Sequence, residues 1–402
     1  MPLHAVQGES GAMELNPFSH EFHEDPYPTY RWLRDHAPVY RHADGWYALS
    51  RYDDVLWASQ QPRLFSSAEG TTLEKVDAAL MPPMIIFMDP PMHDRQRKLV
   101  SRAFTPRAIS DLEPVIRALA NRFLDDLGTG GGGDFIEEFS GRLPNNVIME
   151  LIGVPEADRD DLRHKMDATL DRLEEPPYIP EHAFQAMIDM HQYWAEQLPV
   201  KRANPDGKLL SRLLDVEVEG DDGEPTRLAD DEVLGFVQLI GSAGTETVTK
   251  LLANAAVLFQ RNPDQWQKVL DDPATIPGAV EEILRFWAPS QYQGRVLTDD
   301  VTLHGETIPT GARVLLLTGS ANRDERAYPD PDRFDIERGE HVALGFGHGV
   351  HFCLGASLAR LESRIAIEEL ARRFPDYRVD EAGVERVHMS NVHGFKRVPV
   401  TV

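Results

Sequence analysis

The chain contains very little cysteine, with Cys353 as the single residue of this type among 402. One cysteine cannot form a disulfide within the chain, and such usage is typical of proteins that work in a reducing cytoplasm. Any role for Cys353 must therefore be that of a thiol, a thiolate or a metal ligand. We expect a cytoplasmic protein without disulfide bonds.

Long hydrophobic runs are missing as well. No apolar stretch reaches the about 18 residues that a membrane-spanning helix needs, and the N-terminus lacks the pattern of a signal peptide.

Positive charge is scarce: 41 basic residues stand against 66 acidic ones, which gives a formal net charge of −25. This charge repels nucleic acid and anionic membranes, so neither is expected as a partner.

Internal repeats, heptad arrays and linker-like changes in composition are absent too. Their absence favours one helix-rich domain over residues 1–402, with residues 1–15 as a flexible N-terminal segment. Amphipathic spacing predicts helices over most of 111–260. Surface loops are expected to interrupt these helices at 128–134, 174–180 and 219–226.

Two shorter segments have distinct patterns. The glycine run 128–134 lacks the lysine and the hydroxyl of a phosphate-binding loop, so we expect a flexible connection there. Strand-like pieces between 296 and 317 are separated by turn-forming pairs such as His304-Gly305. They predict a small β region in a mainly helical protein.

Cys353 lies in the segment FGHGVHFCLG, residues 346–355, among glycines and aromatic residues. Glycine allows unusual backbone dihedral angles and close approach of the backbone to a flat ligand. The apolar spacing after Gly355 predicts a helix, and a helix N-terminus favours a thiolate over a thiol. A small buried side chain is the alternative interpretation of a lone cysteine.

The spacing Phe346-x-x-Gly349-x-x-x-Cys353-x-Gly355 resembles the haem-binding loop of the cytochrome P450 family. The resemblance implies that the Cys353 sulfur is the axial ligand of the iron in haem b and that Phe346 lies beside this cofactor. It also implies a mainly α fold: a large helical lobe with small β-sheets, and haem buried between a long central helix and the cysteine loop.

Cationic residues in three places match the family's contacts to the haem propionates. His93 and Arg97 are four residues apart, on one face of a predicted helix. Arginine can bind a carboxylate through two donors, and the resemblance assigns Arg97, His93, Arg295 and His351 to the propionates. A surface pair, for example Arg97 with Asp94, is the alternative.

A long, largely buried helix is predicted over 230–260, with Gly244 near its middle. Glycine there costs about 1 kcal/mol relative to alanine, so we expect something to approach the backbone of this helix, or the helix to be locally opened to admit ligand or water.

By resemblance, this part of the helix binds molecular oxygen. Ala243 is expected to lie against the haem, and Glu246 and Thr247 to be the acid and the alcohol that relay protons. The structural alternatives are an ion pair between Glu246 and Lys250, and a Thr247 hydroxyl bonded to its own helix.

Glu282 and Arg285 stand one helical turn apart, a spacing that by itself contributes only about 0.2–0.5 kcal/mol. They resemble the Glu-x-x-Arg helix of the family, for which Arg333 matches the third member. The resemblance implies a buried ion network of these residues that supports the haem loop.

Candidate substrate contacts come mainly from the segment before His93, which the family places over the distal pocket. Packed core is the alternative for the apolar candidates, and backbone capping is the alternative for Gln291 and Gln293. The candidates are Met84, Ile85, Ile86, Phe87, Ile240, Gln291, Tyr292 and His393.

The sequence therefore predicts a monooxygenase that hydroxylates a medium-sized, mostly apolar organic molecule. It resembles the soluble bacterial type, which receives electrons from a separate ferredoxin and its reductase. A haem-thiolate sensor and a peroxide-driven oxygenase are the alternatives, and the Glu246–Thr247 pair disfavours both. A basic patch for an acidic ferredoxin is predicted from Lys98, Arg102, Arg107, Arg360 and Arg364, with solvated surface positions as the alternative.

Overall fold

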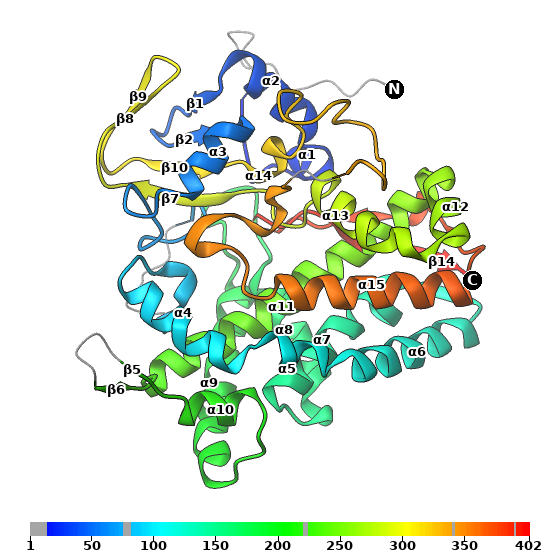
Figure 1. Ribbon diagram of the computed structural model, residues 1–402. Coiled ribbons are helices and arrows are strands. Elements are labelled where there is room, and N and C mark those ends of the chain that lie inside the picture. Colours follow the sequence, from blue (N-terminus) through cyan, green and yellow to red (C-terminus); the bar gives the residue numbers. More distant parts are fainter. Residues whose placement is uncertain (1–13, 75–81, 220–223, 340–341, 390) are drawn as a thin grey trace.

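Helix α11 (Asp230–Arg261) runs through the middle of the molecule, and other helices pack around it (Figure 1). The computed structural model describes residues 14–74, 82–219, 224–339, 342–389 and 391–402. Residues 1–13 of the predicted flexible segment lie outside this part of the chain. Leu15 is fully buried, so the flexibility predicted for residues 1–15 does not extend through this residue.

The predicted series of helices is present on both sides of α11. Before it lie α1 (His20–Glu24), α2 (Tyr27–His36), α3 (Tyr52–Ser59), α4 (Met92–Ala103), α5 (Pro106–Ser110), α6 (Glu113–Thr129), α7 (Arg142–Ile152), α8 (Arg159–Thr169), α9 (Glu181–Ala203) and α10 (Leu209–Asp215). After it lie α12 (Pro263–Asp271), α13 (Ile276–Phe286), α14 (Thr318–Ala321) and α15 (Ala356–Arg373). A π-helical turn, η3 (Ile136–Ser140), precedes α7.

Apolar residues cover most of the circumference of α11, and a helix of this kind is stable only when it is enclosed. It packs against α7, α8 and α9 on one side and against α13 and α15 on another. Phe236, Leu252 and Phe259 of α11 join a large core that also includes apolar residues of α6, α7 and α15. This packing holds the middle of α11 in a fixed position opposite the cysteine loop.

The β structure consists of short strands. One sheet has the order β1-β2-β10-β7-β3, another β11-β14-β4, and the remaining strands pair as β5-β6, β8-β9 and β12-β13. Their bounds are β1 (Val39–Arg41), β2 (Tyr47–Leu49), β3 (Phe65–Ser66), β4 (Gly132–Asp134), β5 (Val218–Glu219), β6 (Pro225–Thr226), β7 (Gln293–Leu297), β8 (Val301–Leu303), β9 (Glu306–Ile308), β10 (Arg313–Leu316), β11 (Arg378–Val379), β12 (Glu385–Arg386), β13 (Phe395–Arg397) and β14 (Pro399–Thr401).

The β region predicted between 296 and 317 is confirmed. Strands β7 to β10 occupy it, and His304 and Gly305 turn the β8–β9 hairpin with φ of 51° and 84°. The prediction of a flexible connection at 128–134 is wrong for its second half. Gly132 belongs to strand β4, and a Cβ atom there would lie 2.1 Å from the Val400 carbonyl oxygen of β14. The close approach of β14 therefore requires glycine at this position.

Glu282 and Arg285 of α13 form a buried ion pair. Arg285 Nε lies 2.7 Å from Glu282 Oε2, and both side chains are 3% exposed. Arg285 also donates to the carbonyl oxygens of Asn322 and Pro331, at 2.9 Å each. The pair thus ties α13 to the irregular chain that leads toward the cysteine loop.

The predicted third member of this network is wrong. Arg338, with Nε 3.2 Å from Glu282 Oε1, occupies the place expected for Arg333. The Arg333 side chain is 60% exposed and lies beside Asp335, and only the Arg333 carbonyl oxygen accepts a bond from Arg285. The direction of the chain at this turn decides which of the two arginines points inward.

Replacement of Arg285 by alanine is expected to lower the free energy of unfolding by about 3–5 kcal/mol, because the Glu282 carboxylate would lose its buried partner. Urea unfolding measures the loss. The matched control is Arg333→Ala, which removes an exposed side chain and is expected to change stability by no more than about 0.5 kcal/mol. Equal effects of the two substitutions would contradict the assignment.

Candidate functional site

The cysteine loop precedes α15 and depends on two glycines. Gly347 and Gly349 have φ of 68° and 72°, which favours glycine at both positions. A Cβ atom on Gly349 would also lie 2.2 Å from the Ser59 carbonyl oxygen of α3. The Cys353 amide then donates to the Phe346 carbonyl oxygen at 2.9 Å, which closes the loop. These constraints fix the position of the Cys353 side chain.

Burial raises the pKa of the Cys353 thiol, and the backbone N–H groups of Gly355 and Ala356 and the charges of Arg97 and Arg360 lower it in part. The predicted preference for a thiolate at the start of the helix is therefore outweighed by burial in the protein alone. Coordination to a metal ion deprotonates a thiol. The loop thus suits a sulfur that becomes anionic when it binds a metal.

Four cationic or titratable side chains from separate segments lie together near this loop. Burial lowers the pKa of His351 to about 3, and the charges of Arg295, His93 and Arg97 contribute to this shift. The His93 and His351 rings are 4.6 Å apart. Helix α4 supplies His93 and Arg97, strand β7 supplies Arg295, and the cysteine loop supplies His351. The structure therefore brings together the four residues that the sequence assigned to one ligand.

The two arginines of this cluster lack carboxylate partners within ion-pair distance in the part of the chain described here. Arg97 donates to the Phe352 carbonyl oxygen at 2.9 Å, and Arg295 donates to the Gly294 carbonyl oxygen at 2.7 Å. Burial lowers the pKa of Arg295 to about 10. Buried cations are normally paired, so this donor set fits a ligand that carries two carboxylates. A haem with its two propionates has this chemistry.

The face of α11 opposite the cysteine loop is less enclosed than the rest of the helix. Ala243 is exposed, and Ile240 and Thr247 are half-buried, although their neighbours on α11 are mostly buried. The close approach predicted at the mid-helix glycine is made by helix α7. A Cβ atom on Gly244 would lie 3.2 Å from Cγ1 of Ile148, so this glycine lets α7 approach. The helix itself is continuous from Asp230 to Arg261.

Both structural alternatives for the acid and the alcohol are present. Lys250 Nζ lies 2.6 Å from Glu246 Oε1, and both side chains are nearly fully buried. The Thr247 hydroxyl donates to the Ala243 carbonyl oxygen at 2.7 Å. Thr247 remains half-buried at the less enclosed face, whereas the Glu246 side chain is buried.

Known proteins are similar to this chain in sequence and in fold. The family model for cytochrome P450 matches residues 36–385. Cytochrome P450 123 of Mycobacterium tuberculosis is 44% identical over 393 residues, 96% of each chain. The vitamin D(3) 25-hydroxylase of Pseudonocardia autotrophica is 41% identical over 403 residues, 98% of each chain. The crystal structure of CYP109E1 from Bacillus megaterium in complex with testosterone has a TM-score of 0.83 and 30% identity, covering 94% of this chain and 99% of that one.

The chain belongs to the cytochrome P450 family. Its fold is accordingly the mainly α-helical cytochrome P450 fold with small sheets, as predicted. In the segments that the structure describes, no helix is both long and apolar enough to span a membrane.

The candidate substrate contacts of this cytochrome P450 fall into two groups. Ile86 and Phe87, in the short 3₁₀ helix η2 (Ile85–Phe87), are half-buried, whereas Met84 and Ile85 are buried. Ile85 joins the main core, which is the alternative that the sequence left open for it. Ile86, Phe87 and Ile240 keep partly exposed apolar side chains. Substrate contact stays a prediction for all of these residues.

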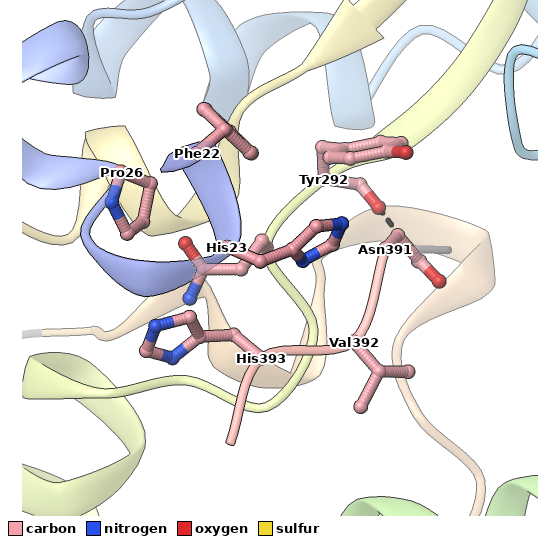
Figure 2. A pocket seen from close by; sticks show the side chains of 8 residues that line it. Phe22, His23, Pro26, Tyr292, Asn391, Val392 and His393 are labelled. Atoms are coloured by element: carbon pink, nitrogen blue, oxygen red, sulfur yellow. Dashed lines mark hydrogen bonds between the residues drawn. The ribbon is translucent and has the colours of Figure 1, made fainter. Parts of the chain in front are cut away.

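A different, small cavity is lined by Gln291, Tyr292 and His393 together with residues at and just after α1 (Figure 2). Its volume is about 10 Å³, enough for about one water molecule. The Gln291 amide donates to the Ala288 carbonyl oxygen at 2.7 Å, and Tyr292 packs in an apolar cluster with Phe22. Gln293 donates to the Ser290 hydroxyl at 2.7 Å. This cavity does not support substrate contact, which stays a prediction for these three residues.

The predicted basic patch is smaller than the sequence suggested. Arg360 pairs with Glu281 at 2.6 Å, and Arg364 pairs with Glu113 at 3.1 Å and with Glu368 at 2.8 Å. These two arginines of α15 are therefore largely neutralised by acidic neighbours. Lys98, Arg102 and Arg107 are exposed on α4 and α5, and Arg102 donates to a carbonyl oxygen.

Arg295→Met is expected to weaken haem binding about 10- to 100-fold, because one charge-assisted contact contributes about 1.5–3 kcal/mol. Titration of the apoprotein with haemin measures the affinity. The control Arg41→Met removes an exposed arginine of strand β1 and is expected to leave the affinity unchanged. Unchanged affinity in Arg295→Met would show that Arg295 does not hold a propionate.

Proposed function

We propose that the protein is a haem-thiolate monooxygenase that hydroxylates a medium-sized, mostly apolar organic molecule. The observation that carries the proposal is the convergence of Cys353 with Arg97 and Arg295, two cations that lack a carboxylate within ion-pair distance among the described residues. The central helix α11 has a less enclosed face around Ala243. An anionic, planar cofactor is the ligand that this combination of groups suits best.

Each part of the chain has a defined task in this proposal. Cys353 would hold the iron of haem b through its sulfur, and Arg97, Arg295, His93 and His351 would hold the propionates. Bound haem supplies the activation of molecular oxygen. The apolar side chains on the α11 face exclude water and orient the substrate.

Proton supply falls to Thr247 and Glu246. The Thr247 hydroxyl is bonded to the Ala243 carbonyl oxygen, which leaves the hydroxyl oxygen free to accept a bond from water at the less enclosed face. Glu246 is the nearest acid along the helix, and it can move a proton from the protein interior toward this hydroxyl. Because Glu246 and Thr247 are adjacent in the chain, we propose that Glu246 supplies the proton and that the Thr247 hydroxyl passes it on.

Rigid, largely apolar molecules of steroid type are the substrate class that we propose. The relatives give the first reason: one is a vitamin D(3) hydroxylase, and another was crystallised with testosterone. The half-buried side chains of Ile86, Phe87 and Ile240 give the second, because a wall of aliphatic and aromatic groups binds such molecules through area burial.

A separate ferredoxin with its reductase is the proposed electron source. Exposed Lys98, Arg102 and Arg107 stand out in a chain of net charge −25 and would attract an acidic partner. They lie on the elements next to the cysteine loop, because Arg97 of α4 bonds directly to Phe352 of that loop. Electrons would therefore enter close to the sulfur ligand.

The central test is the carbon monoxide spectrum of the reduced protein together with turnover of a steroid. We expect the strongly red-shifted Soret band of a thiolate-bound haem and a product one oxygen atom heavier than the substrate. In Cys353→Ser the red shift should disappear, because serine is a harder and far less acidic ligand. An unshifted band in the wild type, or an unchanged band in the variant, would refute the proposal.

Thr247→Ala is expected to keep haem binding and substrate affinity nearly intact, since neither depends on this hydroxyl. Product formed per pair of electrons should fall several-fold, with the missing electrons recovered as hydrogen peroxide or water. Reductant consumption, product and peroxide are measured in the same reaction.

Two results would contradict this role. Unchanged coupling would show that Thr247 is not the relay. Lost substrate affinity with coupling preserved would show that Thr247 is part of the pocket wall.

A further inference from the structure

Asp89, in the segment between η2 and α4, accepts two hydrogen bonds from the end of strand β3. Its Oδ1 accepts a bond from the Ser67 backbone N–H at 2.9 Å, and its Oδ2 accepts one from the Ser66 hydroxyl. The Ser66 hydroxyl in turn accepts a bond from the Ala68 N–H at 3.1 Å. Both carboxylate oxygens therefore hold the chain at residues 66–68, which fixes the position of Ser67.

The Ser67 hydroxyl contacts one member of the cluster of two arginines and two histidines beside the cysteine loop. Ser67 is fully buried, and its Oγ lies 3.1 Å from Nε2 of His351. A hydroxyl can donate to a bare ring nitrogen or accept from a ring N–H. In either case the bond orients the His351 ring, which lies 4.6 Å from the ring of His93.

Asp89 is also linked to the elements that carry the other members of the cluster. Ser66 of β3 pairs with Val296 of β7, the neighbour of Arg295. The Asp89 carbonyl oxygen accepts a bond from the His93 N–H at 3.0 Å, at the start of α4. Burial lowers the pKa of Arg295, and the charge of Asp89 opposes this shift. Asp89 thus connects β3, α4 and β7 at the place where their cationic side chains meet.

We infer that Asp89 and Ser67 are positioning residues of the haem site: Asp89 holds Ser67 in place, and the Ser67 hydroxyl orients the His351 ring for a haem propionate. This inference rests on the proposed function, in which His351 holds a propionate. The alternative is that Ser67 only completes the turn after β3, for which its backbone N–H suffices. Its hydroxyl reaches His351, so the side chain has a task that the turn does not explain.

The orientation of the ring matters because a histidine side chain has two rotatable bonds. A carboxylate binds an imidazole only when a ring N–H points toward it. A ring that is already oriented loses less conformational freedom when the ligand binds. Loss of the hydroxyl is therefore expected to weaken haem binding about 2- to 10-fold, which is the effect of one neutral hydrogen bond.

Histidine ring signals in nuclear magnetic resonance spectra of the full-length protein test the contact itself. The reduced, carbon monoxide-bound form is used because its haem is diamagnetic, and the His351 signals are assigned by their loss in His351→Phe. We expect Ser67→Ala to shift these signals. The control Ser110→Ala removes an exposed hydroxyl of α5 and should leave them in place. Unchanged His351 signals in Ser67→Ala would overturn the inference.

Transfer of haem from the loaded protein to an excess of a haem-scavenging protein tests whether the contact serves the cofactor. Ser67→Ala should lose haem about 2- to 10-fold faster than the wild type. A positioning residue acts through its partner, so Ser67→Ala should add no further effect in a His351→Phe background. Effects of equal size in both backgrounds would show that Ser67 serves the fold alone, and this result, like an unchanged rate in Ser67→Ala, would contradict the inference.

Two substitutions of Asp89 test how it holds Ser67. In Asp89→Asn the amide oxygen can still accept the Ser67 N–H, and the amide nitrogen can donate to the Ser66 hydroxyl, so the His351 signals should stay close to those of the wild type. Asp89→Ala leaves both donors without an acceptor and should shift the His351 signals as Ser67→Ala does. Unshifted signals in Asp89→Ala would remove Asp89 from the inference.

Failure of the proposed function is distinguishable from failure of this inference. It would appear as a missing thiolate spectrum in the wild type. The ring signals report on the contact between Ser67 and His351 even in a protein that binds no haem.

Discussion

The structure depends on two positive charges, those of Arg97 and Arg295, for which the described residues supply no carboxylate within ion-pair distance. Arg97 and Arg295 come from a helix and a strand that are nearly 200 positions apart, and both lie at the edge of the cysteine loop. Keeping two guanidinium groups in a poorly solvated place is unfavourable unless an anion joins them. The fold therefore holds the site ready for a dianionic ligand, and we expect ligand binding and stability to be linked.

Rigid packing on both sides of this group positions the chemistry. The cysteine loop is fixed by contact of Gly349 with α3, and α11 is fixed by contact of Gly244 with α7. At both positions the need for glycine comes from contact with another part of the protein. Each allows one part of the framework to approach another, and the two approaches together determine the distance between the sulfur and the acid–alcohol pair. Packing therefore determines the geometry in which the charged groups interact.

Local sequence patterns predicted several elements correctly. The prediction of the third member of the Glu282–Arg285 network failed, because it lies in an irregular turn. The cysteine loop, the helix of Glu246 and Thr247, and the β hairpin at His304 follow from spacing and glycine positions, and the structure has all three elements. Arg338 replaced Arg333 because both lie in one irregular turn, where no periodicity indicates the buried side.

The sequence by itself determined the family, and it indicated the candidate sulfur ligand Cys353 and the long central helix, because these depend on residue types at short fixed spacings. Only the tertiary structure decided that two arginines and two histidines from separate segments share one place, and that Arg360 and Arg364 are neutralised. The physical reason is the distance along the chain over which each kind of interaction acts. Backbone preference and helical periodicity act over a few residues, whereas charge pairing and burial depend on which distant segments the fold brings together.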